Sequence, residues 1–255
     1  MAAIYEPQKA SFLKRASAFL LDIILVAILA TGFAFLVAWI CKYDSHLANL
    51  NSIIDAYSAE YGINLSMTQA EYDALSQAEK ELFELATKAL VADSSYQGCM
   101  NMLFNLTILI ISLSLLFSTL ILEFVIPLIF KNGQTVGKKC FSLIVVKQNS
   151  VRMNNISLFI RTVLGKFTIE LMVPALIIIL IFFGFLGLVG TIVIIGLLVL
   201  QVCLLIFNRY HAPIHDLLAL TVVVDKSTQL IFDDEESLIK YKEELGKDVA
   251  KHQSY

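Results

Sequence analysis

Three carboxylates lie inside long apolar stretches of the chain, where a charged side chain is costly. Asp22, Glu123 and Glu170 are each the only charged residue in an apolar block. A carboxylate at the centre of a membrane helix costs about 2.5–3.5 kcal/mol on insertion scales, and such residues usually serve proton relays or ion pathways. Each of the three therefore predicts either an ion-pair partner or an ion-binding role.

Two more charged residues are expected to lie near Asp22. Arg15 precedes Asp22 by seven residues, on nearly the same helix face, and Asp216 follows the last apolar block directly. We expect Arg15 to lie between Asp22 and Asp216. Because one arginine cannot neutralise two acids, the remaining negative charge would take up a proton or attract a cation. The alternative is that the three residues only hold the helices together.

The other two acids differ in how easily a partner is found. Glu123 lies at a membrane depth similar to that of Asp22 and has no obvious basic partner, which favours a function for it. Glu170 follows Lys166 by four residues, and this spacing predicts an interfacial ion pair on one helix.

Other chemistries fit the sequence poorly. The stretch KNGQTVGKKC has only three residues between Gly133 and Gly137, and Lys138 is followed by a lysine, whereas a phosphate-binding loop needs four residues and a Ser or Thr. His211 and His215 have metal-ligand spacing, but a proline between them disfavours a helix and no further ligand completes a site. We expect no nucleotide, metal or cofactor and no enzymatic activity.

The apolar blocks predict an all-α membrane protein. Of 255 residues, 58% are hydrophobic and 16% are charged, whereas about a quarter are charged in soluble domains. A span needs about 20 apolar residues, so the blocks predict four transmembrane helices, the last two separated by FFGFLG. The expected segments are an N-terminus 1–15, spans 16–41, 101–130, 167–183 and 187–207, a helical cap 42–100, a basic loop 131–166 with a strand, and a segment 208–255 with a strand and a charged helix.

The distribution of charge predicts the orientation. Residues 131–166 carry seven Lys or Arg and no acid, whereas residues 42–99 carry three basic and nine acidic residues. The positive-inside rule places the basic loop and both termini in the cytoplasm. The protein is then a multi-pass cell-membrane protein whose acidic segment faces outward.

Short patterns predict structure outside the spans. Two capping boxes, TQAE at 68–71 and SQAE at 76–79, predict helix starts in the outer cap. The β-branched runs LIVVK at 143–147 and TVVVD at 221–225 predict two cytoplasmic strands that pair. Cys41 and Cys99 flank the outer cap at matching depth and could form a disulfide in an oxidising compartment, or else remain free thiols.

The chain resembles the RDD family of membrane proteins, named for one arginine and two aspartates, which match Arg15, Asp22 and Asp216. The stretch GQTVGKKCFSLIVV resembles the family's GQT-x-GK element, and HDLLALTVVV resembles its closing element. The chain departs from the family at Leu217 and Leu220, where basic and glycine residues are common, and in its longer outer segment. The matching motif residues are Gly133, Gln134, Thr135, Gly137, Lys138, His215 and Thr221.

A few RDD proteins are described as sodium/proton antiporters, so the resemblance implies ion transport. We therefore expect cation/proton exchange, with Asp22 as the exchanging carboxylate, Arg15 as its modulator, and Asp216 and Glu123 as supporting acids. Four helices form a thin bundle for alternating access, so we expect a homo-oligomer in the lipid bilayer, with monovalent cations and protons as ligands and no nucleic acid. The alternative is a non-transporting scaffold that binds a protein partner or anionic lipid.

Overall fold

The computed structural model describes residues 7–131, 133–208 and 212–253, so His211 lies outside the described residues. The chain divides into two compact units. One unit comprises Met1–Thr31 with Leu115–Tyr255, and the other comprises Gly32–Ser114. All of the buried charges discussed below belong to the first unit.

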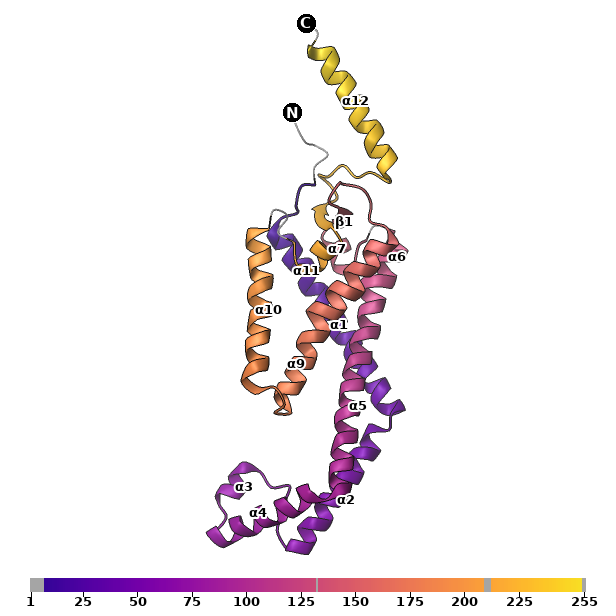
Figure 1. Cartoon of the computed structure of the whole chain (residues 1–255). Coiled ribbons are helices and arrows are strands. Elements are labelled where there is room, and N and C mark those ends of the chain that lie inside the picture. The colour runs from indigo at the N-terminus through magenta and orange to yellow at the C-terminus, as the bar shows by residue number, and fades with distance from the viewer. Residues whose placement is uncertain (1–6, 132, 209–211, 254–255) are drawn as a thin grey trace. The chain divides into compact units, whose positions relative to one another are not determined.

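Four helices among the described residues are long and apolar enough to cross a membrane, as the sequence predicts (Figure 1). They are α1 (Phe12–Ile40), a continuous helix Ser94–Phe130, a continuous helix Asn155–Phe182, and α10 (Gly187–Phe207). The second consists of α5 (Ser94–Thr119), η1 (Leu120–Val125) and α6 (Ile126–Phe130). The third consists of α8 (Asn155–Phe159), η2 (Ile160–Met172) and α9 (Val173–Phe182).

α1 begins at Phe12 rather than residue 16, and two later helix starts differ from the predicted ones by more. The second long helix begins at Ser94 rather than residue 101, and the third begins at Asn155 rather than residue 167. Asn154 caps the third helix by accepting a hydrogen bond from the Ser157 amide at 2.9 Å, which stabilises a helix start. The predicted basic loop is therefore shorter, and its last basic residues are helical. The break between the last two spans falls at 183–186, as expected.

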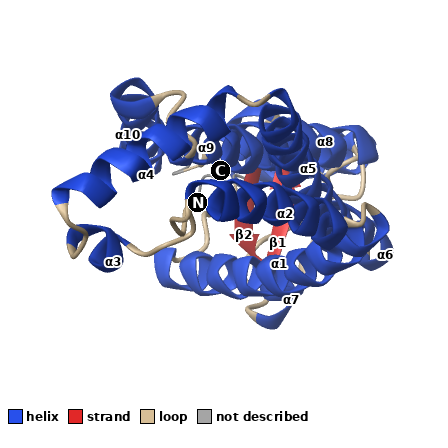
Figure 2. Cartoon of the chain, turned by 90° about the horizontal axis from the view of Figure 1, so that it is seen from below, coloured by secondary structure: helices blue, strands red, loops and turns tan. Residues whose placement is uncertain are grey.

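The two predicted strands pair. β1 (Leu143–Lys147) and β2 (Thr221–Asp225) form an antiparallel sheet in which Val145 faces Val223 (Figure 2). Ala10, just before α1, donates its amide to the Val223 carbonyl at 3.1 Å. Ala10 and Ala18 pack with Leu143, Val145 and Val223 in one apolar cluster. This cluster attaches the start of α1 to the sheet.

Three further helices precede or follow the two strands along the chain. α7 (Val136–Cys140) precedes β1, and α11 (Ile214–Leu218) precedes β2. α12 (Glu235–Gln253) follows the sheet and buries Leu238 against Val151 and Phe232. The charged C-terminal helix is therefore present as predicted, and Leu238 and Tyr241 anchor it to Phe232.

The second unit is helical, as expected for the outer segment. Beside the parts of α1 and α5, it contains α2 (Tyr43–Tyr61), α3 (Gln69–Asp73) and α4 (Gln77–Ala92). Both predicted capping boxes form, with Thr68 and Ser76 as the N-cap residues. Cys41 and Cys99 are free thiols in the structure, so the alternative of two unlinked cysteines holds here.

Candidate functional site: a buried network of acids and bases

Asp22 is held by the glycine-lysine loop that follows the second long helix. The hydroxyl of Thr135 donates to Asp22 Oδ2 at 2.5 Å, and the amide of Gly137 donates to Oδ1 at 2.7 Å. The ammonium of Lys138 lies 3.8 Å from Oδ2. Asp22 is 6% exposed. Its negative charge is thus compensated by the loop.

The sequence of the loop explains why it can surround a carboxylate. Gly133 has φ +61°, a conformation that only glycine adopts at little cost. Gln134 donates its side-chain amide to the Leu143 carbonyl at 2.7 Å, which ties the loop to β1. Thr135 is the N-cap of α7 and accepts a hydrogen bond from the Lys138 amide. A β-carbon on Gly137 would lie 2.2 Å from the Ala18 carbonyl oxygen, so only glycine permits this approach of α1.

Glu123 pairs with Lys166 across two helices. The Lys166 ammonium lies 2.5 Å from Glu123 Oε1, and the hydroxyl of Thr162 donates to the Glu123 carbonyl at 3.0 Å. The second carboxylate oxygen, Oε2, is buried and has no hydrogen-bond partner among the described residues. Glu123 is therefore a buried acid with one oxygen occupied by a lysine and one oxygen available.

Asp216 pairs with Arg161 in the interior. Arg161 Nε donates to Asp216 Oδ1 at 2.7 Å, and the hydroxyl of Thr221 donates to the same oxygen at 2.7 Å. Arg161 is 1% exposed. Burial alone would raise the pKa of Asp216, but the positive charge of Arg161 outweighs this and holds that pKa well below its usual range. Asp216 is therefore a carboxylate at every physiological pH.

His215 links this pair to Glu170. Its Nδ1 lies 2.7 Å from Glu170 Oε2, and its Nε2 lies 3.1 Å from Arg161 Nη2. Burial lowers the pKa of His215, with a further contribution from Arg161, and nearby Asp216 and Glu170 oppose this only in part. A neutral imidazole that donates through Nδ1 and accepts at Nε2 satisfies both contacts.

Two helical segments with i→i+5 hydrogen bonds carry most of these side chains. Glu123 lies in η1, whereas Arg161, Lys166 and Glu170 lie in η2. Such wide turns usually occur singly and are frequent at functional sites, and the 13 residues of η2 make an unusually long one. Arg161 and Glu170 both contact His215 on α11, whereas Lys166 contacts Glu123 on η1.

Gly165 makes the contact between η2 and α11 feasible. A β-carbon on Gly165 would lie 2.5 Å from the His215 β-carbon. The absence of a side chain lets His215 fit between Arg161 and Glu170. This close packing explains why the histidine can contact both residues.

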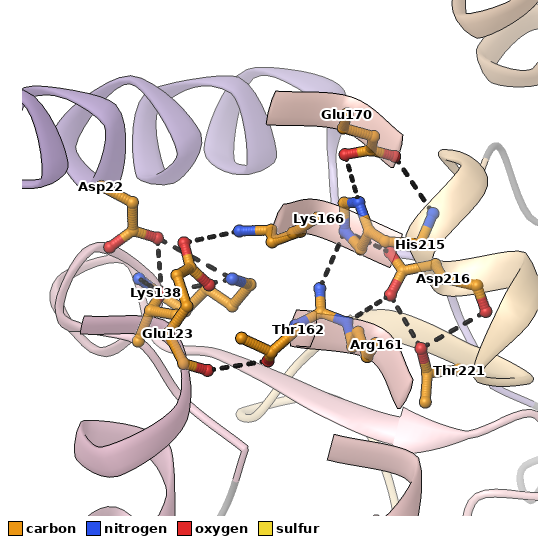
Figure 3. A network of polar contacts seen from close by, with 11 residues as sticks. Asp22, Glu123, Lys138, Arg161, Thr162, Lys166, Glu170, His215, Asp216 and Thr221 are labelled. Carbon is orange, nitrogen blue, oxygen red and sulfur yellow. Dashed lines mark hydrogen bonds and ion pairs between the residues drawn. The ribbon is translucent and has the colours of Figure 1, made fainter. Parts of the chain in front are cut away.

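The charges form one cluster in space (Figure 3). Lys138 is 7% exposed. Burial, together with the nearby Lys166, lowers its pKa from 10.5 to about 8, although Glu123 and Asp22 oppose the shift. Lys138 is thus a buried amine whose pKa is lower than that of an exposed lysine.

The structure corrects two sequence-based pairings. Arg161, rather than Arg15, is the ion-pair partner of Asp216, and the loop residues Thr135 and Gly137 hold Asp22. The expectation that Arg15 positions both aspartates is therefore wrong, although the charge of Asp216 does act on Arg15. Arg161 follows a loop with several other basic residues, and its spacing to Asp216 in the sequence gives no sign of their contact.

The second correction concerns Lys166. The structure pairs it with Glu123, while Glu170 contacts His215, so the expected Lys166–Glu170 pair is not formed. The two side chains therefore contact different elements, η1 and α11. Glu123, for which the sequence offered no partner, has one after all. Thr162 and Gly165 also belong to the network, and no pattern in a single sequence identifies them.

A cavity of about 500 Å³ adjoins the network. Arg15, Lys138, Arg161 and Lys166 contribute basic groups to its lining, and α1, α9 and α10 contribute apolar side chains. No group of three or more His, Cys, Asp or Glu residues suited to a metal ion occurs among the residues that the structure describes. The site therefore combines paired buried charges with an apolar-walled cavity.

These features define a multi-pass membrane protein with a buried polar network where the strand pair meets the helices. The family model of the RDD family matches residues 9–220. The chain belongs to the RDD family, as the three motifs indicated. The comparison with curated proteins found no match, and the comparison with solved structures found none either.

Proposed function

We propose that this protein exchanges a monovalent cation for a proton across the membrane, and that the Glu123–Lys166 pair is the exchange site. The observation that carries the proposal is the unoccupied oxygen of Glu123. A buried carboxylate normally has all its oxygens satisfied. Here Oε2 has no donor among the described residues, while the other oxygen contacts a lysine at 2.5 Å.

The chemistry of the exchange needs only these two side chains. A cation that binds the Glu123 carboxylate displaces the Lys166 ammonium from it. The displaced amine then releases one proton, so the net charge of the site stays constant. Lys166 and Lys138 both line the cavity, and the neutral amine of Lys138 accepts the proton. Lysine can perform this step because its amine can lose a proton, whereas an arginine remains charged.

The roles of the other charged residues follow from their contacts. In this proposal Asp22 and Asp216 keep the loop and α11 in place, because both have short contacts to dedicated donors. Lys138 serves as a proton acceptor beside the cavity. The assignment of Asp22 as the exchanging carboxylate is therefore replaced by Glu123.

The test is flux in proteoliposomes that contain the full-length protein and a pH-sensitive dye. Adding Na⁺, K⁺ or Li⁺ outside should move protons, whereas choline should not. Lys166→Arg should preserve the ion pair and the melting temperature but abolish flux, because arginine cannot release the proton. Lys147→Arg, at a surface ion pair with Glu235, should leave flux unchanged.

The rival function, a non-transporting scaffold, predicts different results. It requires that no cation moves protons above the rate of empty liposomes. Normal flux in Lys166→Arg would instead show that exchange occurs without this lysine. The double variant Glu123→Gln with Lys166→Met removes both charges together, so it should fold and be inactive.

A further inference from the structure

The cavity beside the network combines two chemistries. Its walls carry apolar side chains, including Phe19 on α1 and Ile194 and Leu197 on α10. Its charged part is formed by residues of α1, α7, η2 and α11. All of the residues that line the cavity belong to one compact unit. A ligand that fills it needs an apolar part and a charged part.

The charge exposed to the cavity is mainly positive. Four cationic residues line it, namely Arg15, Lys138, Arg161 and Lys166, whereas the two carboxylates that line it are Glu170 and Asp216. With neutral His215, four positive and two negative groups leave a formal charge of +2 on the lining. Asp22 and Glu123, which pair with Lys138 and Lys166, do not line the cavity. The charged groups that a ligand would contact there are therefore mostly cationic, and an anionic group is the complementary ligand.

The apolar walls continue onto the outer surface of the helices. Phe12, Phe19 and Leu198 line the cavity and are also 66%, 53% and 62% exposed. In a bilayer, the outer surface of these spans contacts hydrocarbon. An apolar chain can therefore extend from the cavity into the membrane.

We propose that this cavity binds an anionic phospholipid, with its phosphate at Arg15, Lys138 and Lys166 and an acyl chain along the apolar walls of α1 and α10. A volume of about 500 Å³ is within the usual range of about 300–1,000 Å³ for ligand pockets, and it accommodates the headgroup phosphate and the first part of a chain. Clusters of basic residues at the membrane face recognise such lipids. This proposal requires no transport step, although the phosphate would contact Lys138 and Lys166, which also belong to the proposed exchange site.

Native mass spectrometry of the full-length protein released from detergent tests the proposal. The protein is titrated with each of two lipids. It should retain one molecule of dioleoylphosphatidylglycerol about tenfold more tightly than it retains dioleoylphosphatidylcholine, as expected for a charge-assisted contact. Equal retention of the two lipids would overturn the proposal. Full displacement by millimolar inorganic phosphate would show a free-anion site instead and would also overturn it.

Two tryptophan variants locate the lipid. Leu197→Trp fills the cavity and should reduce phosphatidylglycerol retention about tenfold. Val199 lies on the same helix, is 56% exposed and does not line the cavity. The Val199→Trp variant should therefore retain the lipid normally. Equal retention by both variants would place the lipid elsewhere and would overturn the proposal.

Arg15→Gln tests the charged end separately. It should remove the preference for phosphatidylglycerol over phosphatidylcholine while phosphatidylcholine retention stays the same. An unchanged preference would contradict the assignment of the phosphate to Arg15. If this variant does not fold, the tryptophan pair still decides the location.

Discussion

Gly137 and Asp22 are in direct contact: the glycine amide donates to the carboxylate at 2.7 Å, and a β-carbon on the glycine would lie 2.8 Å from the same oxygen. The contact joins α1 to the loop after the second long helix. The glycine-lysine motif therefore binds a buried aspartate of the same chain. It resembles a phosphate-binding loop only in composition.

Gly137→Ala should destabilise the protein by about 1–3 kcal/mol, the usual cost of overpacking. The added methyl group would lie 2.2 Å from the Ala18 carbonyl oxygen, so backbone must move. Thermal unfolding in detergent measures the effect. Gly196→Ala is the matched control, because a β-carbon there meets nothing within 4 Å. Equal melting temperatures for the two variants would contradict the close approach of α1.

The Arg161–Asp216 pair should show strong energetic coupling. Removing one partner of a buried pair costs about 3–5 kcal/mol, because the other charge is left uncompensated. Arg161→Met and Asp216→Asn should each show this loss, and the double variant should recover part of it. The cycle is measured as the free energy of unfolding in mixed micelles.

A second cycle at an exposed pair provides the reference for this measurement. Arg152 and Asp233 lie 2.9 Å apart with side chains 48% and 73% exposed, so their coupling should be below about 1 kcal/mol. Coupling of Arg161 with Asp216 no larger than this value would refute the buried pair.

Lys138 should make stability rise at alkaline pH. Its pKa falls from 10.5 in the unfolded chain to about 8 in the folded protein. Between these values the unfolded chain holds the proton that the folded protein has released, so the free energy of unfolding increases with pH. Below about pH 8 Lys138 is protonated in both the folded and the unfolded protein. The folded protein then bears the full free-energy cost of burying the charged ammonium.

The size of the effect is about 3 kcal/mol at most between pH 8 and 10.5. Lys138→Met removes the titrating group, so its stability should lack this increase. Unfolding curves of both proteins at half-unit steps of pH provide the comparison. Parallel pH dependence of the two would show that Lys138 does not titrate in this range.

The orientation in the membrane stays a prediction from charge. In a variant with all four cysteines replaced by serine, a cysteine at Ser94 should react with a membrane-impermeant reagent in intact cells. A cysteine at Glu236 should react only after the cells are permeabilised. Both positions are exposed. The reverse pattern would invert the sidedness.

The sequence by itself determined the elements that depend on local composition. Apolar length predicts the four spans because a bilayer needs about 20 apolar residues for each of them. The pairing of β1 with β2 follows from two lone β-branched runs whose backbone groups need partners. The capping boxes that begin at Thr68 and Ser76 are likewise predicted from a local pattern of four residues.

Only the packing of the helices determines which buried acid contacts which base or donor. Asp22 contacts residues 113 and 115 positions later, and Arg161 contacts a residue 55 positions later. Such partners depend on how helices pack, and a few ångströms of displacement change the pairing of side chains with the same charge. Lys166 and Glu170 are four residues apart, yet they contact different elements, Glu123 on η1 and His215 on α11. Local patterns therefore predict where charges are buried, whereas packing determines what each charge contacts.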